Sequence, residues 1–158
     1  MRVSKPANIQ YAALPWRQTN GALEVLLITT LRTGRWIVPK GWPLADVAPC
    51  DCAAREALEE AGLTGEIASE PFGAFRYAKQ KKSGDSVTCR VEVFTMEVAH
   101  QRRSWAEKDR RHLAWCPVSE AMKRVGDPGL RRLIAKFARA RATAEPRKPV
   151  AARASSAV

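Results

Sequence analysis

The chain has 158 residues, of which 46% are hydrophobic and 27% are charged, a balance typical of one globular domain with an apolar core. It holds no run of about 18 apolar residues, so the sequence predicts no membrane-spanning helix and no membrane partner. Residues 1–10 carry positive charges without an apolar stretch after them, which indicates no secretory signal and leads us to expect a cytoplasmic protein.

The pattern of apolar residues predicts an α/β fold, with a mixed sheet covered by helices on both faces. Residues 8–16 are predicted to form a first strand, and residues 23–32 a second, whose continuous apolar middle indicates burial on both faces. Residues 36–39 are expected to form a third, short strand. A loop broken by glycine and proline then leads to a helix between Pro49, which suits a first helical position, and Gly62, a typical residue just past a helix end.

Beyond this helix the pattern continues with strands, a charged loop and two helices. Their expected ranges are strands at residues 66–79, 86–98 and 112–118, a loop at residues 100–111, and helices at residues 119–125 and 128–140. Ser119 is expected to cap the first of these helices. The second helix has the spacing of a core-facing helix, carried by Leu130, Leu133, Ile134 and Phe137.

The formal net charge of +11 and the pI of about 10.1 predict an anionic partner, such as a phosphorylated metabolite, a nucleotide or a nucleic acid. Part of this charge lies in residues 142–158, which are rich in Ala, Pro, Arg and Ser and have no apolar period. We expect these residues to be a disordered, solvated tail after a domain of residues 1–141, with weak RNA binding or a membrane-surface role as the alternative. The sequence makes no prediction of oligomeric state.

Four cysteines raise the question of a zinc site. Together with His112 they give the spacings Cys-x-Cys and His-x3-Cys, which differ from the usual zinc-finger patterns. We therefore expect reduced and mostly buried thiols at Cys50, Cys52, Cys89 and Cys116.

The stretch REALEEAGL, residues 55–63, crowds three carboxylates onto barely more than one turn of the first expected helix. At about 100° per residue, Glu60 lies about 40° and Glu59 about −60° from Glu56, so the three share one side of the helix. The like charges of Glu56 and Glu60 cost roughly 0.2–0.5 kcal/mol in an isolated helix, and the last turn of a helix disfavours anions. The alternatives are a solvated acidic stripe and a divalent cation bound by these oxygens, for which Mg²⁺ or Mn²⁺ is suited.

The segment from Gly41 to Leu63 resembles the Nudix box. That pattern is a glycine, five residues, a glutamate, seven residues, Arg-Glu, an apolar residue, any residue, Glu-Glu, any residue, a glycine and an apolar residue. The positions in register are Gly41, Arg55, Glu56, Ala57, Glu59, Glu60, Gly62 and Leu63. The resemblance covers roughly residues 8–141 and implies the α/β/α sandwich of the Nudix hydrolases, which cleave nucleoside diphosphates linked to another moiety or related pyrophosphates.

One position departs from the box, because Val47 stands where the pattern has its first glutamate. Valine can neither ligate a metal nor take a proton, and the sequence leaves open whether the neighbouring Asp46 replaces the carboxylate. The alternative to an active hydrolase is therefore a Nudix-like regulator that binds a nucleotide or RNA with little or no turnover.

By this resemblance Glu56, Glu59 and Glu60 hold the metal, while water attacks phosphorus and a phosphate-type group leaves. Arg55 would brace the Glu59 carboxylate. The general base would be one of the box glutamates, with Glu59 as our candidate among them, or Glu107 from the charged loop, whose plainer interpretation is a solvated glutamate.

Within the family, the segments VLLITTLRTGRWIVPKG and SWAEKDRRHLAW are most similar to diphosphoinositol polyphosphate and diadenosine polyphosphate hydrolases. Those enzymes act on acidic small molecules, in agreement with the basic charge of this chain. The turn at Gly41 would bring the loop backbone close to the substrate, and the expected phosphate contacts are Arg32, Arg35, Lys40, Lys79, Lys81, Lys82, Arg110 and Arg111. An RNA-end pyrophosphohydrolase, suggested by the basic tail, would keep this chemistry with a different partner.

Overall fold

A computed structural model describes residues 8–144 of the protein. Stretches rich in β-branched and aromatic residues pair there into one central sheet. The strands are β1 (Ile9–Thr19), β2 (Ala22–Thr29), β3 (Trp36–Ile37), β4 (Lys40–Gly41), β5 (Leu63–Ile67), β6 (Gly73–Gln80), β7 (Ser86–Gln101) and β8 (Leu113–Pro117). The sheet has the order β3-β2-β1-β7-β5, while β4 pairs with β1, β6 with β7 and β8 with β2. Only β1 and β7 run parallel among these pairs, so the described sheet is mixed, as predicted.

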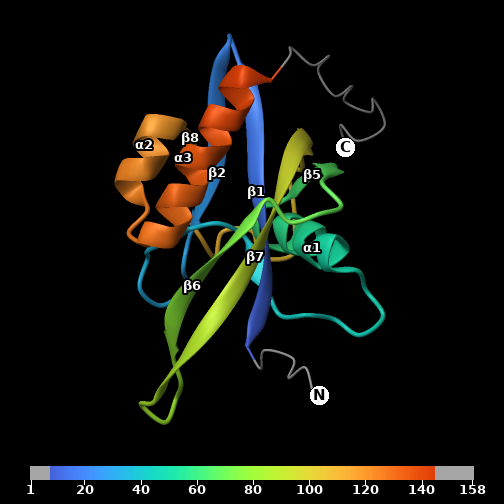
Figure 1. Ribbon diagram of the computed structural model, residues 1–158. Helices are drawn as coiled ribbons and strands as arrows, with labels where there is room; N and C mark the ends of the chain where they lie inside the picture. The colour runs from blue at the N-terminus through green and yellow to red at the C-terminus, as the bar shows by residue number, and fades with distance from the viewer. Residues whose placement is uncertain (1–7, 145–158) are drawn as a thin grey trace, which may run out of the picture.

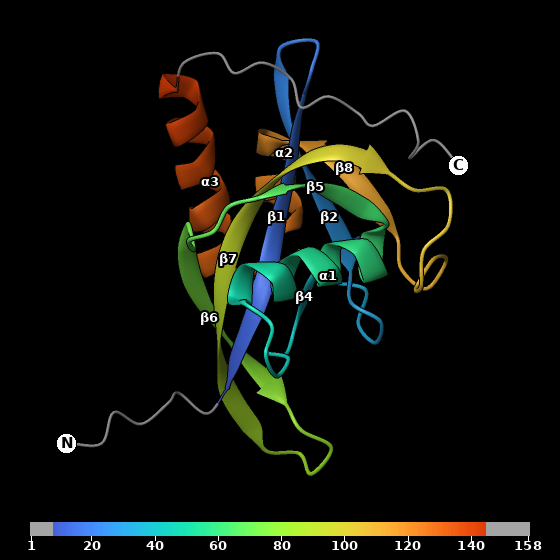
Figure 2. The same cartoon turned by 90° about the vertical axis from the view of Figure 1, so that its right-hand side faces the viewer.

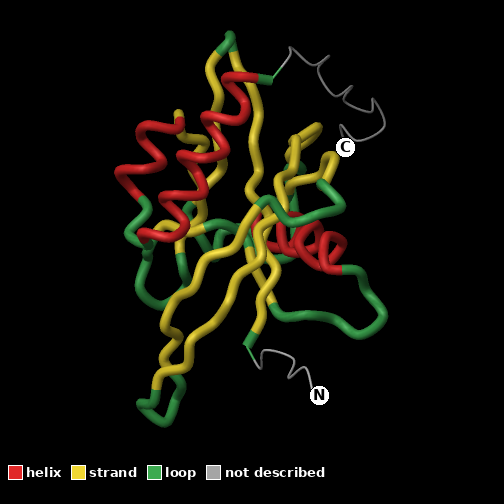
Figure 3. The backbone as a smooth tube through the Cα atoms, viewed as in Figure 1, coloured by secondary structure: helices red, strands yellow, loops and turns green. Residues whose placement is uncertain are grey.

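Helices cover both faces of this sheet. Figure 1 shows α1 (Pro49–Ala61) on one side of the central strands and α2 (Val118–Arg124) and α3 (Pro128–Thr143) on the other, and Figure 2 shows α1 in front of the strands after a quarter turn. The hairpin of β6 and β7 extends beyond the helices at one end of the sheet (Figure 3). The fold is therefore an α/β/α sandwich with a protruding hairpin.

The apolar middle of β2 contributes to a core on each face. Val25 and Leu27 pack in the cluster beneath α3, whereas Leu26 and Ile28 pack in the cluster beneath α1, and all four are 0% exposed. Successive side chains of a strand point to opposite faces, so the predicted burial on both sides is confirmed. The predicted core face of α3 is also confirmed, since all four of its apolar residues are buried: Leu130, Leu133, Ile134 and Phe137.

Several predicted strand ends differ from the structure, since β1 continues to Thr19, β2 ends at Thr29, β3 ends at Ile37 and β7 continues to Gln101. Two further predictions are wrong. Residues 66–79 do not form one strand, because the chain leaves the edge of β7 around Pro71, which has no amide to donate, and so divides into β5 and β6. Ser119 is not a cap, because α2 begins at Val118 with Pro117 at the N-cap and no capping side chain.

The remaining structural predictions concern the chain end, membranes and cysteines. The helix α3 continues through Ala142 to Thr143, past the boundary predicted at residue 141. The rest of the tail predicted at residues 142–158, from residue 145 onward, lies outside the described residues. Within residues 8–144, no helix is long and apolar enough to cross a membrane. All four cysteines are free and three of them are buried, as expected.

Candidate active site

A stripe of alanines holds α1 against the sheet. Ala53, Ala57 and Ala61 are 0% exposed, and their small side chains let the helix backbone lie close to the strands beneath it. The helix ends at Gly62, whose φ of 71° is left-handed and whose Cα lies so close to the Trp105 ring that a Cβ would collide with it. The loop after β7 is therefore packed directly on the end of the helix.

The three glutamates of the box lie in unequal surroundings. Glu60 is 5% exposed, Glu56 is half-buried and Glu59 is exposed. Burial raises the pKa of Glu60 to about 7, although the Arg111 guanidinium acts in the opposite direction. Burial, followed by repulsion from Glu59, raises the pKa of Glu56 to about 7. Two carboxyls that resist ionisation near neutral pH mark a place where a further positive charge would be stabilising.

Arg111 joins the helix to the loop after β7. Its Nη2 atom lies 2.8 Å from Glu60 Oε2 and 3.3 Å from Glu107 Oε1. The Glu107 amide donates to the Glu59 carbonyl at 3.0 Å, which fixes the loop beside the helix. Glu107 thereby joins the carboxylates of the box, and its charge contributes to the raised pKa of Glu60 and of Glu56. The sequence predicts Glu107 as a site residue but does not predict that Arg111 pairs with both Glu60 and Glu107.

Lys40 reaches the same carboxylates from the sheet. Its backbone amide donates to Glu60 Oε1 at 2.9 Å. Its Nζ donates to Gln10 Oε1 at 3.1 Å and to the Tyr77 hydroxyl at 3.0 Å, and that hydroxyl donates to Gln10 Oε1 at 2.6 Å. Burial, with repulsion from Lys79, lowers the pKa of Lys40 to about 8. The sequence does not identify Gln10 and Tyr77 as site residues. The one available signal is Gln10 itself, a polar residue within an apolar strand.

Gly41, the next residue, explains why the pattern begins with glycine. It pairs with Tyr11 of β1, and a Cβ at this position would overlap the Glu56 carboxylate. A residue without a side chain is needed here because the loop backbone approaches the carboxylate directly.

A cavity of about 650 Å³ opens beside Lys40, between β3, β6 and the start of α3. Its charged lining residues are Arg35, Lys40, Arg76, Arg124 and Asp127, and its aromatic ones are Trp36, Phe75 and Tyr77. Four cations against one carboxylate suit a ligand that carries several negative charges.

The structure brings some of the predicted phosphate contacts to this cavity and leaves others apart. Arg35 and Lys40 line it, whereas Lys79 Nζ lies 4.8 Å from the ring centre of the exposed Trp42. Arg111 is 9% exposed and held between two carboxylates. The remaining predicted contacts are exposed and do not line this cavity: Arg32, Lys81, Lys82 and Arg110.

Arg55 and Asp46 lie on another side of the helix. They line a separate cavity of about 550 Å³, whose lining includes none of the three box glutamates. Among residues 8–144, Arg55 takes part in no ion pair, so its predicted contact with Glu59 is not formed in the structure. Val47, where the box has its first glutamate, lines this cavity together with Asp46.

The donor set of the site suits a hard divalent cation. Carboxylate oxygens are the ligands that Mg²⁺ and Mn²⁺ prefer, and the raised pKa values of Glu56 and Glu60 are what burial without enough positive charge produces. Within the described residues, no three His, Cys, Asp or Glu side chains already form a metal cage. The side chains that would hold the ion are Glu56, Glu59 and Glu60.

Comparison with known proteins assigns the family. The NUDIX domain model matches residues 10–137, so the chain belongs to the Nudix hydrolase family. A relative from Arabidopsis thaliana, Nudix hydrolase 13, mitochondrial, is 30% identical over 106 residues, which is 64% of this chain and 52% of the relative. The diphosphoinositol polyphosphate phosphohydrolase 3-alpha of Mus musculus is 31% identical over 103 residues, 63% of this chain and 58% of that protein. The chain thus spans between half and three-fifths of these relatives.

Solved structures support the fold. The C. elegans Ap4A hydrolase, in a binary complex, superposes with a TM-score of 0.65 at 20% identity, covering 86% of this chain and 98% of the other. The NUDIX domain of Shewanella oneidensis NrtR, solved with ADP ribose, gives 0.64 at 17% identity, covering 89% and 91%. At these identities the likeness confirms the α/β/α sandwich.

Proposed function

We propose that this protein is a divalent-metal-dependent pyrophosphohydrolase that cleaves a phosphoanhydride bond in a nucleoside-diphosphate-linked or polyphosphorylated small molecule. The observation that carries the proposal is the buried Glu60, which receives the Lys40 amide on one oxygen and Arg111 on the other, beside a second half-buried carboxyl at Glu56. A bound Mg²⁺ or Mn²⁺ would neutralise charge on the phosphoryl oxygens and favour ionisation of a water.

The residues of the chain have separate tasks in this reaction. Glu107 is our candidate to accept the proton of the attacking water, because the loop holds it at the edge of the box carboxylates. Lys40 would hold a substrate phosphate, since Gln10 and Tyr77 fix its ammonium at the edge of the cavity. Arg111 Nε is buried and has no hydrogen-bond partner among the described residues, so the guanidinium keeps a donor beyond those that contact Glu60 and Glu107.

The substrate class follows from the cavity and from the relatives. A cavity with Arg35, Lys40, Arg76 and Arg124 supports a compact, highly phosphorylated ligand, and diphosphoinositol polyphosphates and diadenosine polyphosphates both fit that description. Relatives named for each of these compounds are similar to this chain in sequence or in fold.

A second candidate function is a Nudix regulator that binds a phosphorylated ligand with little or no turnover. It is favoured by Val47, which removes one carboxylate, and by Arg111, whose guanidinium already pairs with Glu60. Such a protein would bind its ligand without needing a metal.

A hydrolysis panel with and without Mg²⁺ separates these candidates. The substrates are dinucleoside polyphosphates, diphosphoinositol phosphates, nucleotide sugars, ADP-ribose, nucleoside triphosphates and 5′-triphosphate RNA. The proposal expects metal-dependent release of a phosphorylated product from at least one small molecule. Ligand binding without metal and without turnover across the whole panel would establish the regulator instead.

A further inference from the structure

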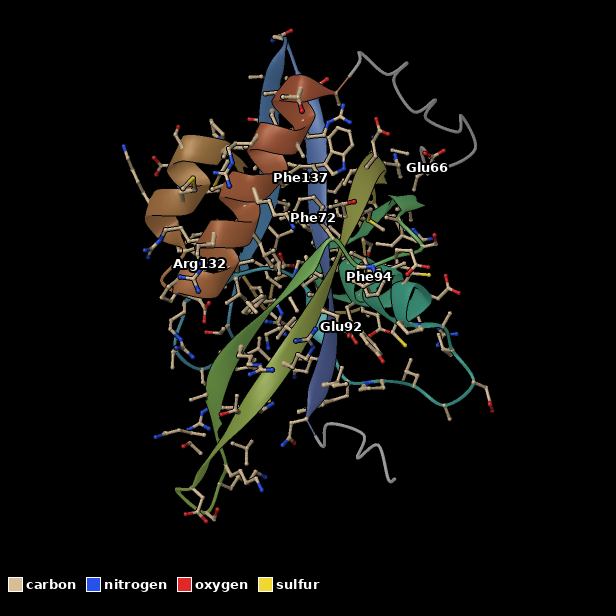
Figure 4. The ribbon with its side chains drawn as sticks, viewed as in Figure 1. Glu66, Phe72, Glu92, Phe94, Arg132 and Phe137 are labelled. Atoms are coloured by element: carbon tan, nitrogen blue, oxygen red, sulfur yellow. The ribbon has the colours of Figure 1, made fainter. Side chains whose placement is uncertain are left out.

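A third cavity of about 640 Å³ runs along α3 on the face of the sheet opposite α1. Its basic lining residues are Arg76, Arg90, Arg132, Lys136 and Arg139, and we name it the α3 groove. Figure 4 shows Arg132 on the half of α3 nearer the hairpin of β6 and β7, and Phe72 and Phe137 beside the helix, toward the central strands. None of the box glutamates lines this groove.

The positive charge of the α3 groove is largely uncompensated. The helix α3 contains no Asp or Glu, and Arg132, Lys136 and Arg139 follow one another at i, i+4 and i, i+3 spacing. Each like-charge pair at such spacing costs roughly 0.2–0.5 kcal/mol in an isolated helix. Among residues 8–144, none of these three side chains takes part in an ion pair.

The two carboxylates near the groove are already engaged. Asp127 Oδ1 accepts the Leu130 amide at 3.0 Å and so caps α3. Glu92 lies 3.8 Å from Arg90 Nε, which leaves the cations of α3 as the dominant charge. Lys136 is held in place because its Nζ lies 4.9 Å from the ring centre of Phe72. A row of cations with few anions is a surface that attracts phosphates.

The α3 groove is continuous with the cavity beside Lys40. Phe75, Arg76, Asp127 and Pro128 line both cavities, so the two join at the start of α3. A ligand whose phosphoanhydride lies near Lys40 could therefore extend past Arg76 and along α3. A compact small molecule would leave most of this path unused.

We propose that the α3 groove binds the sugar-phosphate backbone of single-stranded RNA whose 5′-triphosphate end occupies the cavity beside Lys40. The inference rests on the proposed function and extends its substrates from small molecules to an RNA end. Arginine suits the role because its guanidinium can donate two hydrogen bonds to one phosphate. In the reaction, the oxygen of water bonds to a phosphorus of the α–β anhydride and the bridging P–O bond breaks. RNA 5′-monophosphate and pyrophosphate leave, and the protons of water pass to the general base and to solvent.

The test measures binding and hydrolysis separately in the full chain. Binding is followed by fluorescence polarisation, without metal, on a 5′-triphosphate RNA of about 20 nucleotides, which is longer than the sites of about 4–16 nucleotides known for single-strand binding folds. The variants are Lys136→Glu and Arg132→Glu/Lys136→Glu. The matched control is Lys123→Glu, an exposed lysine on α2 that does not line the groove.

We expect the double variant to bind RNA at least about tenfold more weakly, and the slope of log affinity against log salt to become shallower by about 0.7 for each lost phosphate contact. The control should match the wild type. Hydrolysis of the best small substrate should not change in any of the three variants, whereas hydrolysis of the RNA should fall with its affinity. Circular dichroism confirms folding, and Lys136→Glu alone supplies the readout if the double variant is unstable.

Unchanged RNA affinity and salt slope in the groove variants would overturn the inference, as would preferential binding of inorganic polyphosphate over RNA at the groove. These outcomes are distinct from a failure of the proposed function. If no substrate is hydrolysed but the groove variants lose RNA affinity, the hydrolase assignment is wrong and the groove remains an RNA-binding surface. If small substrates are hydrolysed and the groove variants bind RNA normally, only the groove assignment is wrong.

Discussion

The helices α1 and α3 pack on opposite faces of one sheet and carry opposite charges. The α1 helix has four acidic residues and one arginine, whereas α3 has five basic residues and no acidic one. Each helix carries a like-charge pair at i, i+4 spacing, Glu56 with Glu60 on α1 and Arg132 with Lys136 on α3. The repulsion within each pair does not help either helix to fold. They differ in what they bury, because alanines bring the backbone of α1 close to the strands while large apolar residues anchor α3. We infer that α1 is shaped around a site and that α3 combines an anchor with an anion-binding surface.

The largest effect is expected from Glu60→Gln, which removes the charge of the most buried box glutamate. Hydrolysis should fall by more than about 100-fold, because losing a residue that only supports a metal ligand already costs up to about 100-fold. The fold should persist because Glu107 still neutralises Arg111. The measurement is phosphate release at saturating Mg²⁺, with the exposed Glu70→Gln as the control. Full activity in Glu60→Gln would show that Glu60 holds no metal.

The next largest effect concerns the buried apolar residues that anchor α3 to the sheet. Phe137→Ala should lower the free energy of unfolding by about 3–5 kcal/mol, since its buried ring packs 5.7 Å from both Trp16 and Phe72, centre to centre. Urea unfolding gives this value, and Phe137→Leu should lose less. Small-substrate turnover at a temperature where the variant is folded should match the wild type, because α3 lies across the sheet from the carboxylates. A large loss of turnover in the folded variant would show that the two faces are coupled.

A smaller effect on turnover is expected from Gly41→Ala. The added Cβ would displace the Glu56 carboxylate, so we expect about a tenfold loss of turnover, comparable to losing a residue that orients a ligand. Turnover is measured as for Glu60→Gln, and thermal unfolding supplies the control for stability. If turnover is unchanged, the position of Glu56 does not matter for catalysis.

The smallest effect is a dependence of stability on pH in metal-free protein. The pKa of Glu60 is about 7 in the folded chain, above its ordinary value of 4.5, so folding favours the protonated carboxyl. This stabilisation is complete below the unfolded value and is lost as the pH rises through about 7. The Tm should therefore contain a component that falls between about pH 4.5 and about pH 7, which Glu60→Gln removes and which Mg²⁺ offsets by binding the ionised form. An identical pH profile in Glu60→Gln would contradict the assigned environment of Glu60.

Much of the fold and part of the site were predictable from the sequence, for physical reasons that particular residues illustrate. The run from Val25 to Ile28 and the spacing from Leu130 to Phe137 are local patterns, and local patterns determine which faces are buried. The spacing of Glu56, Glu59 and Glu60 is equally local. By contrast, the contact of Arg111 with Glu60 joins residues far apart in the chain, and it depends on how the loop after β7 closes on Gly62.

The groove along α3 was not predictable for the same reason. Its basic residues were visible in the sequence, but Arg76 and Arg90 come from strands, and only the packing of α3 beside β6 brings them to one surface. The sequence attributed a possible RNA contact to the tail, whereas the described residues offer a folded surface for it.

The most direct test of the account is Mn²⁺ binding, measured by electron paramagnetic resonance of the wild type and its variants without substrate. We predict a bound ion in the wild type, affinity at least about tenfold weaker in Glu56→Gln and in Glu60→Gln, and no change in Arg132→Glu/Lys136→Glu. Equal Mn²⁺ affinity in the wild type and in both glutamine variants would contradict the claim that the acidic helix, and not another part of the protein, holds the cation.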